Sequence, residues 1–148
     1  MGLLLLAVLT FVGQSAARPA NTAEAGRCTT QALVGTWQLA QGKIGDQETP
    51  VGPSKPVELK LLTPTHFIVF QHDPAKKNLV SWVHGGPYEL AGDTYTESIV
   101  YGFGEPFDAL NGQKVQFQCR MEGDKWRISG KFSDGTPLDE TWVRAPKP

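Results

Sequence analysis

The chain has 148 residues, which is enough for one domain and hardly for two. Its 14 Lys and Arg residues nearly balance its 15 Asp and Glu residues, so it lacks the positive face with which a nucleic-acid-binding protein neutralises phosphates. Hydrophobic residues make up 40% of the chain and charged residues 20%, a composition that supports a buried core and excludes disorder throughout.

The N-terminal part of the chain differs in composition from the rest. An apolar run without a charged side chain, residues 3–12, is followed by small residues at 15–17, as in a secretory signal peptide. The run is shorter than the ~20 residues that span a bilayer. A membrane anchor or a buried N-terminal helix is the alternative. We therefore interpret residues 1–17 as a signal peptide and residues 18–30 as a flexible lead-in. The mature protein is expected to be secreted or periplasmic, without stable membrane insertion.

The chain has two cysteines, Cys28 and Cys119. Export into an oxidising compartment permits a disulfide between them, which would close a large loop. Two free thiols, one of them buried, are the alternative. The sequence has no CxxC motif and no cluster of Cys and His, so we expect no metal site. It also has no glycine-rich phosphate loop and no nucleophile elbow, and we expect no cofactor.

After residue 30 the sequence is typical of a succession of short β-strands. Runs of apolar and β-branched residues alternate with turn residues such as Gly45-Asp46. No stretch has a clear 3.6-residue apolar period, which argues against a βαβ fold. The pattern predicts eight strands, at residues 36–41, 57–62, 65–72, 79–90, 94–101, 114–121, 125–132 and 138–144.

Eight consecutive antiparallel strands with short connections favour one architecture, an all-β up-and-down barrel formed by residues 31–145. Closure into a barrel removes the exposed strand edges that would otherwise aggregate. A sandwich of two β-sheets is the structural alternative. An eight-stranded barrel is just wide enough to hold one small ligand if its own side chains do not fill it.

The hairpin around residues 91–93 identifies an interior face. A two-residue turn at either Ala91-Gly92 or Gly92-Asp93 places aromatic residues of both strands on the same face as His84 and Glu97. The first turn would place His84 diagonal to Glu97, within reach of contact. The second turn would place these two side chains too far apart for direct contact.

The next hairpin, with its turn at Gly123-Asp124, predicts a second stretch of interior. It aligns Phe117 and Cys119 with Trp126 on one face. An inward Cys119 is compatible with a disulfide only if the N-terminal segment closes one end of the barrel. Glu140 joins the same face if the last loop gives the matching register.

Several short motifs resemble those of the bacterial secreted lipocalin-like domain proteins of unknown function, which have calycin-type barrels. They are residues 33–37, with a Gly-x-Trp signature, residues 63–67, residues 85–88 with 95–97, and residues 122–126 with 140–144. The resemblance covers about residues 31–145 and implies an eight-stranded barrel. It also implies that Trp37 of the first strand packs against Arg144 of the last strand at the closed end.

We predict that the barrel binds a small, mostly apolar molecule with an aromatic or acyl body. Aromatic side chains would supply flat walls, and acidic and histidine side chains would orient the ligand. Gly85-Gly86 would provide either a bend or room in the interior. The candidate ligand-binding residues are His66, Trp82, His84, Tyr88, Tyr95, Glu97, Tyr101, Phe117, Trp126 and Glu140.

Two other functions fit the same sequence. The first is a barrel enzyme that uses Glu97, His84 or both as general acid and base in an isomerase- or hydrolase-like step. The second is a filled, structural barrel that binds another protein through its loops. The sequence leaves the oligomeric state open.

Overall fold

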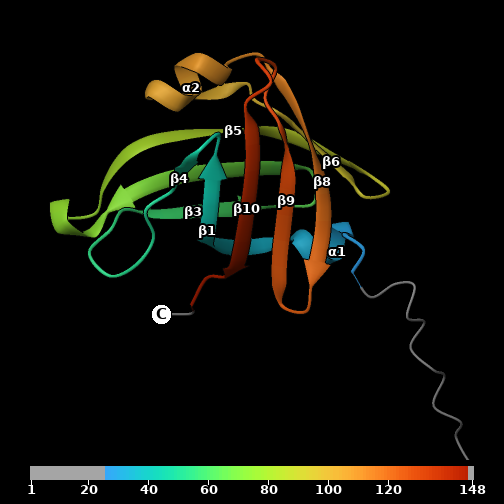
Figure 1. The fold of residues 1–148 in the computed structure, drawn as a ribbon, viewed down its shortest axis with the longest axis horizontal. Helices are drawn as coiled ribbons and strands as arrows, with labels where there is room; N and C mark the ends of the chain where they lie inside the picture. Colours follow the sequence, from blue (N-terminus) through green and yellow to red (C-terminus); the bar gives the residue numbers. More distant parts are fainter. Residues whose placement is uncertain (1–25, 147–148) are drawn as a thin grey trace, which may run out of the picture.

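The protein forms a closed antiparallel β-barrel in a computed structural model that describes residues 26–146 (Figure 1). Each barrel strand pairs with its neighbours in turn, and the first and last strands close the barrel through pairs such as Trp37 with Arg144. The predicted fold class is therefore confirmed. The eight barrel strands are β1 (Gly35–Ile44), β3 (Val57–Leu62), β4 (His66–Asp73), β5 (Leu79–Ala91), β6 (Thr94–Ser98), β8 (Lys114–Glu122), β9 (Lys125–Lys131) and β10 (Pro137–Arg144).

Three short elements lie outside the eight-stranded ring. Strand β2 (Gln47–Glu48) forms a hairpin with β1, and strand β7 (Tyr101–Phe103) pairs with β5. A 3-10 turn, η1 (Pro74–Lys76), connects β4 to β5.

The predicted strand at 94–101 is wrong in its second half. Strand β6 ends at Ser98, and after two intervening residues the chain resumes as β7 in a different register against β5. The helix α2 (Glu105–Leu110) then follows, which the sequence did not predict. It has only six residues, too few to show a helical apolar period, and it begins after Gly104 with a proline in its first turn.

The two hairpin registers that define the interior are fixed by their turns. Leu90 pairs with Tyr95, so the first hairpin turns at Gly92-Asp93. Strand β7 is shifted by one residue from this register, so His84 lies opposite Gly102 rather than Tyr101. The second hairpin turns at Gly123-Asp124, as predicted, and its interior face includes the pair of Met121 and Trp126. The last loop gives the register in which β10 joins this face, with Trp142 opposite Trp126.

The short helix α1 (Thr30–Leu33) closes one end of the barrel (Figure 1). Leu33 is fully buried, and its carbonyl oxygen accepts a hydrogen bond of 2.7 Å from the Trp37 indole. The Arg144 guanidinium lies 3.8 Å from the centre of the Trp37 ring and donates hydrogen bonds to the carbonyl oxygens of Ala32 and Val34. Arg144 therefore joins the last strand to the helix and to the first strand, which is the contact that the family resemblance implies.

Cys28 and Cys119 form the predicted disulfide, and both are almost fully buried. Cys119 points inward, and the N-terminal segment reaches it at the closed end of the barrel. This is the arrangement that a disulfide to an inward Cys119 requires. Residues 1–17, interpreted as a signal peptide, and residues 18–25 of the expected lead-in lie outside the described residues. In the described part of that lead-in, Cys28 is buried and Thr29 caps α1, so this part packs against the barrel.

Aromatic rings fill the closed half of the barrel. The Trp126 ring centre lies 5.5 Å from that of Trp37, 5.4 Å from that of Tyr95 and 6.2 Å from that of Trp142. These side chains are almost completely buried. The opposite half of the barrel interior is not filled in this way and contains a cavity.

Within residues 26–146, no helix is both long enough and apolar enough to span a membrane.

Candidate functional site

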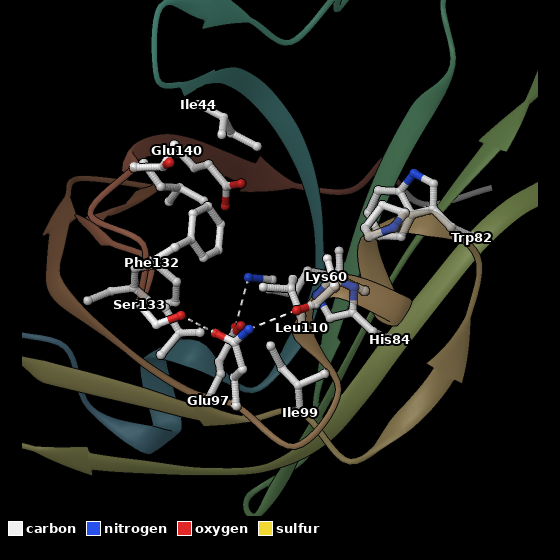
Figure 2. Close-up of a pocket in the computed structure, with 18 of the residues that line it drawn as sticks. Ile44, Lys60, Trp82, His84, Glu97, Ile99, Leu110, Phe132, Ser133 and Glu140 are labelled. Atoms are coloured by element: carbon white, nitrogen blue, oxygen red, sulfur yellow. Dashed lines mark hydrogen bonds and ion pairs between the residues drawn. The ribbon is translucent and has the colours of Figure 1, made fainter.

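The open half of the barrel contains a cavity of about 640 Å³ (Figure 2). Its inner walls come from the barrel strands. Its rim comes from α2, the end of β1 and the loop between β9 and β10. The main lining residues are Ile44, Glu58, Lys60, Val69, Trp82, His84, Glu97, Ile99, Pro106, Leu110, Val115, Phe117, Phe132, Ser133, Asp134, Leu138, Glu140 and Trp142.

Half of the residues proposed from sequence line this cavity. They are contributed by strands β5, β6, β8 and β10, whose inward faces the hairpin registers had identified. These five are Trp82, His84, Glu97, Phe117 and Glu140.

Three of the other candidates lie in the closed half of the barrel. Tyr95 and Trp126 are fully buried in the aromatic core and do not reach the cavity. The Tyr88 hydroxyl donates a hydrogen bond of 3.0 Å to the carbonyl oxygen of Thr63, which holds it at the turn between β3 and β4. Their interior positions were predicted correctly, but the sequence could not tell which half of the barrel is filled.

The remaining two candidates are on the outside of the barrel. His66 is exposed, and its Nδ1 atom lies 2.9 Å from the Thr65 hydroxyl. Tyr101 is 43% exposed and donates a hydrogen bond to the carbonyl oxygen of Phe67. Tyr101 was placed inside because the interior face of β6 was extended through Ser98, where the strand in fact ends.

Lys60 is as deeply buried in the cavity wall as Glu97, and the sequence analysis missed it. Its ammonium lies 2.9 Å from the Glu97 carboxylate, and both side chains are only 4% exposed. The same ammonium lies 4.9 Å from the centre of the Trp142 ring and 5.4 Å from that of Trp126. The opposite charge and the faces of the aromatic rings together compensate for the loss of hydration.

The alternation of β3 concealed the role of Lys60. Apolar residues alternate along this strand with Glu58 and Lys60, and the charged residues face inward. The outward apolar residues are half-buried against cross-strand neighbours, with Leu59 opposite Phe70. The hairpin of β3 and β4 could have indicated that Lys60 faces inward. Lys60 pairs with Val69, which lies on the inward face of β4, and partners in such a pair point to the same side of the sheet.

His84 is buried beside the cavity, and its imidazole forms no hydrogen bond within residues 26–146. The Trp82 ring stacks on its imidazole, with ring centres 5.4 Å apart and an angle of 14° between the planes. Burial lowers the pKa of His84 to about 4, because the raising effect of Glu97 does not offset desolvation and the nearby Lys60. The imidazole is therefore neutral at pH 7, and no hydrogen bond joins it to Glu97.

Among the carboxyl groups that line the cavity, Glu140 has the largest change in pKa. Burial raises its pKa to about 7; Lys60 opposes the rise, and the carboxylates of Glu58 and Glu97 add to it. One oxygen of Glu140 accepts a hydrogen bond of 3.0 Å from the Trp142 indole. Glu58, also missed by the sequence analysis, accepts a hydrogen bond from Gln71, and burial raises its pKa.

Gly85 and Gly86 allow close approach of the backbone and do not widen the cavity. A Cβ atom on Gly86 would collide with the carbonyl oxygen of Ser98. A Cβ atom on Gly85 would collide with the carbonyl oxygen of Phe67 and the Tyr101 ring. Close approach of neighbouring backbone is thus the reason for these glycines, and it is neither the bend nor the room that the sequence analysis proposed.

In the part of the chain that the structure describes, no group of three or more His, Cys, Asp or Glu side chains is placed to hold a metal ion.

The fold and the cavity together define a lipocalin-like barrel. A lipocalin-like protein from Bacteroides uniformis is similar in structure, with a TM-score of 0.53 and 16% identity over 77% of this chain and 99% of that chain. An uncharacterized protein from Bacteroides eggerthii gives a TM-score of 0.52 at 14% identity, over 76% of this chain and 99% of that chain. A redesigned β-barrel gives 0.51 at 21% identity, over 79% and 95% of the two chains.

The chain matches no protein-family model and no curated protein. The structural likenesses show the fold, and at this level the resemblance to lipocalin-like proteins is confirmed.

Proposed function

We propose that this protein binds one small molecule inside its barrel. The observation that carries the proposal is the cavity of about 640 Å³, which has the size of a typical ligand site. A barrel with a purely structural role would be expected to fill its interior with its own side chains, as the closed half does here.

The walls of the cavity favour a ligand with a flat, mostly apolar body. Val69, Ile99 and Phe117 are buried apolar residues in the lining, and the Trp82 ring stacks on His84 at the same cavity. An aromatic ring system or a compact acyl chain would bury its surface against these side chains.

We favour binding over acid–base catalysis by Glu97 and His84. The Glu97 carboxylate is held by Lys60, and within residues 26–146 no carboxylate forms a hydrogen bond with the His84 imidazole. His84 and Glu97 therefore do not form the hydrogen-bonded dyad on which the catalytic alternative was based.

We also propose that the protein acts outside the cytoplasm. The buried Cys28–Cys119 disulfide supports this location, because such bonds persist in oxidising compartments. Fractionation of the native host should recover the disulfide-bonded chain outside the cytoplasm. Recovery of the reduced chain in the cytoplasm would contradict this part of the proposal.

Binding can be tested with Nile red, a neutral fluorophore whose emission shifts to the blue in apolar surroundings. We expect saturable binding of one molecule per chain. Val69→Phe places a larger side chain in the cavity wall between Lys60 and His84 and should weaken binding by at least about tenfold.

The matched control is Val143→Phe, which adds the same side chain on β10 at a position that does not line the cavity. This variant should bind Nile red like the unmodified protein. No saturable binding, or equal loss of binding in both variants, would contradict the proposal.

A further inference from the structure

We infer that the ligand of this cavity is an organic cation, with an ammonium group that binds the carboxyl groups of Glu140 and Glu58. The inference rests on the proposed function and specifies the chemical class of the ligand.

The charge of the cavity wall is unbalanced. Glu58, Glu97 and Glu140 line it, with Asp134 at the rim, whereas Lys60 is the one lysine or arginine in the described lining. His84 is buried and neutral at pH 7. Lys60 pairs with Glu97, and the carboxyl groups of Glu58 and Glu140 form no salt bridge within residues 26–146.

Glu58 and Glu140 both have unused capacity to accept hydrogen bonds. They come from β3 and β10, the two strands that flank β1. Glu58 accepts a side-chain hydrogen bond from Gln71, and Glu140 accepts one from Trp142. An ionised carboxylate offers about four acceptor sites, and no lysine, arginine or histidine within residues 26–146 forms a salt bridge with either group.

A second, independent feature indicates that a polar ligand belongs here. The His84 imidazole is only 8% exposed, lines the cavity, and its Nδ1 atom has no hydrogen-bond partner in the described structure. A buried polar atom without a partner is costly, and a ligand would supply the missing interaction. Figure 2 shows Glu140 on one side of the cavity and the Trp82–His84 stack on the other, with Lys60 and Glu97 between them.

This arrangement fits a molecule with an ammonium group at one end and an aromatic or apolar body that carries a hydrogen-bonding group for His84, such as the N–H of an indole ring. The ammonium would meet Glu140 and Glu58, and the body would lie toward Trp82 and His84. An anionic ligand fits poorly, because the Lys60 ammonium is already paired with Glu97 and the carboxyl groups of Glu58 and Glu140 would repel a further negative charge.

Competition against bound Nile red at pH 8 tests the sign of the ligand's charge. Two series keep the body constant and change the charged group. The indole series is tryptamine, tryptophol and indole-3-propionate; the alkyl series is octylammonium, octanol and octanoate. We expect at least one ammonium compound to displace Nile red at a concentration at least about tenfold lower than its neutral partner, and each carboxylate to be weakest in its series.

The carboxyl group responsible is tested with Glu140→Gln, which should remove the tenfold advantage of the ammonium compound and leave the neutral compound unchanged. The matched control is Asp139→Asn, which changes the adjacent carboxylate on β10. Asp139 pairs with Arg127 outside the cavity, so this variant should keep the preference.

Failure of the inference is distinguishable from failure of the proposed function. If Nile red binds but neither ammonium compound surpasses its neutral partner, or a carboxylate binds best, the ligand is not a cation. Loss of the preference in both variants would also overturn the role of Glu140. Absence of Nile red binding would overturn the proposed function itself.

Discussion

The ammonium of Lys60 and the carboxylate of Glu97 are joined across the barrel interior at 2.9 Å. They come from β3 and β6, which are separated in the sheet by β4 and β5. The bond therefore connects two walls of the barrel directly and forms part of the cavity wall. It also explains how two charges are retained at 4% side-chain exposure in this interior.

Breaking this ion pair from one side should be strongly destabilising. Glu97→Leu leaves the Lys60 ammonium buried without a counter-charge, and we expect a loss of about 3–5 kcal/mol in the free energy of unfolding. The double variant Lys60→Met/Glu97→Leu removes both charges and should recover most of that loss. Urea denaturation of the single and double variants measures the coupling. Additive losses would show that the two side chains do not depend on each other.

Arg144 should contribute far more stability than an arginine on the barrel surface. Arg144→Ala removes a cation over the Trp37 ring and two hydrogen bonds to carbonyl groups around α1, so we expect a loss of about 1–3 kcal/mol. The control, Arg127→Ala, removes an exposed salt bridge to Asp139 and should cost about 0–1 kcal/mol. Equal effects in chemical denaturation would argue against a special role for the closed end.

The Cys28–Cys119 disulfide should stabilise the fold substantially. It joins residues 91 positions apart, and the loop-entropy model gives a contribution on the order of 4–5 kcal/mol. Thiol titration of the denatured, unreduced protein should find no free thiol, and a reductant should lower the melting temperature. Two titratable thiols, or a melting temperature unchanged by reduction, would contradict this prediction.

Glu140 should make the protein less stable as the pH rises. Its pKa is raised from 4.5 to about 7 in the folded state, so between these values the folded protein binds more protons than the unfolded chain. The stabilising contribution of the protonated form is complete below pH 4.5 and is lost as the pH rises through about 7. Glu140→Gln should therefore gain stability relative to the unmodified protein between pH 5 and pH 8, by on the order of 1–3 kcal/mol.

His84 has the opposite effect on stability in nearly the same pH range. The pH dependence of stability is therefore measured for variants at both Glu140 and His84. Its pKa falls from 6.5 to about 4 on folding, so its contribution is present above pH 6.5 and is lost as the pH falls toward 4. His84→Gln should become more favourable relative to the unmodified protein on acidification. Denaturation curves at several pH values check both slopes, with Asp139→Asn as a control for the loss of an acidic group outside the cavity. Parallel pH profiles for all four proteins would contradict the pKa assignments.

The sequence predicted those parts of the fold that local turns determine. The Gly123-Asp124 turn fixes the register that brings Met121 opposite Trp126, and a register of this kind follows from the turn alone. The closure of the barrel was inferable from the number of strands and the need to avoid free edges. The helix α2 was not, because six residues are too short for a periodic signal.

The candidate site was only partly predictable, because its main interaction joins distant parts of the chain. The sequence left two registers open for His84 and Glu97, and the structure has the one that separates them. The partner of Glu97 is instead Lys60, which lies on a strand paired with neither β5 nor β6. Nor could the sequence tell which half of the barrel is filled, since that depends on how α1 and the aromatic side chains pack at one end.

Native mass spectrometry of the protein purified from its own host tests the central claim, ligand binding in the barrel cavity, most directly. We expect the unmodified protein to carry one small molecule that is released on denaturation, and Val69→Phe to lack it. Val143→Phe, whose substitution lies outside the cavity lining, should retain the molecule. Detection of the bare chain alone in all three proteins would contradict the claim, and so would an adduct that persists unchanged in Val69→Phe.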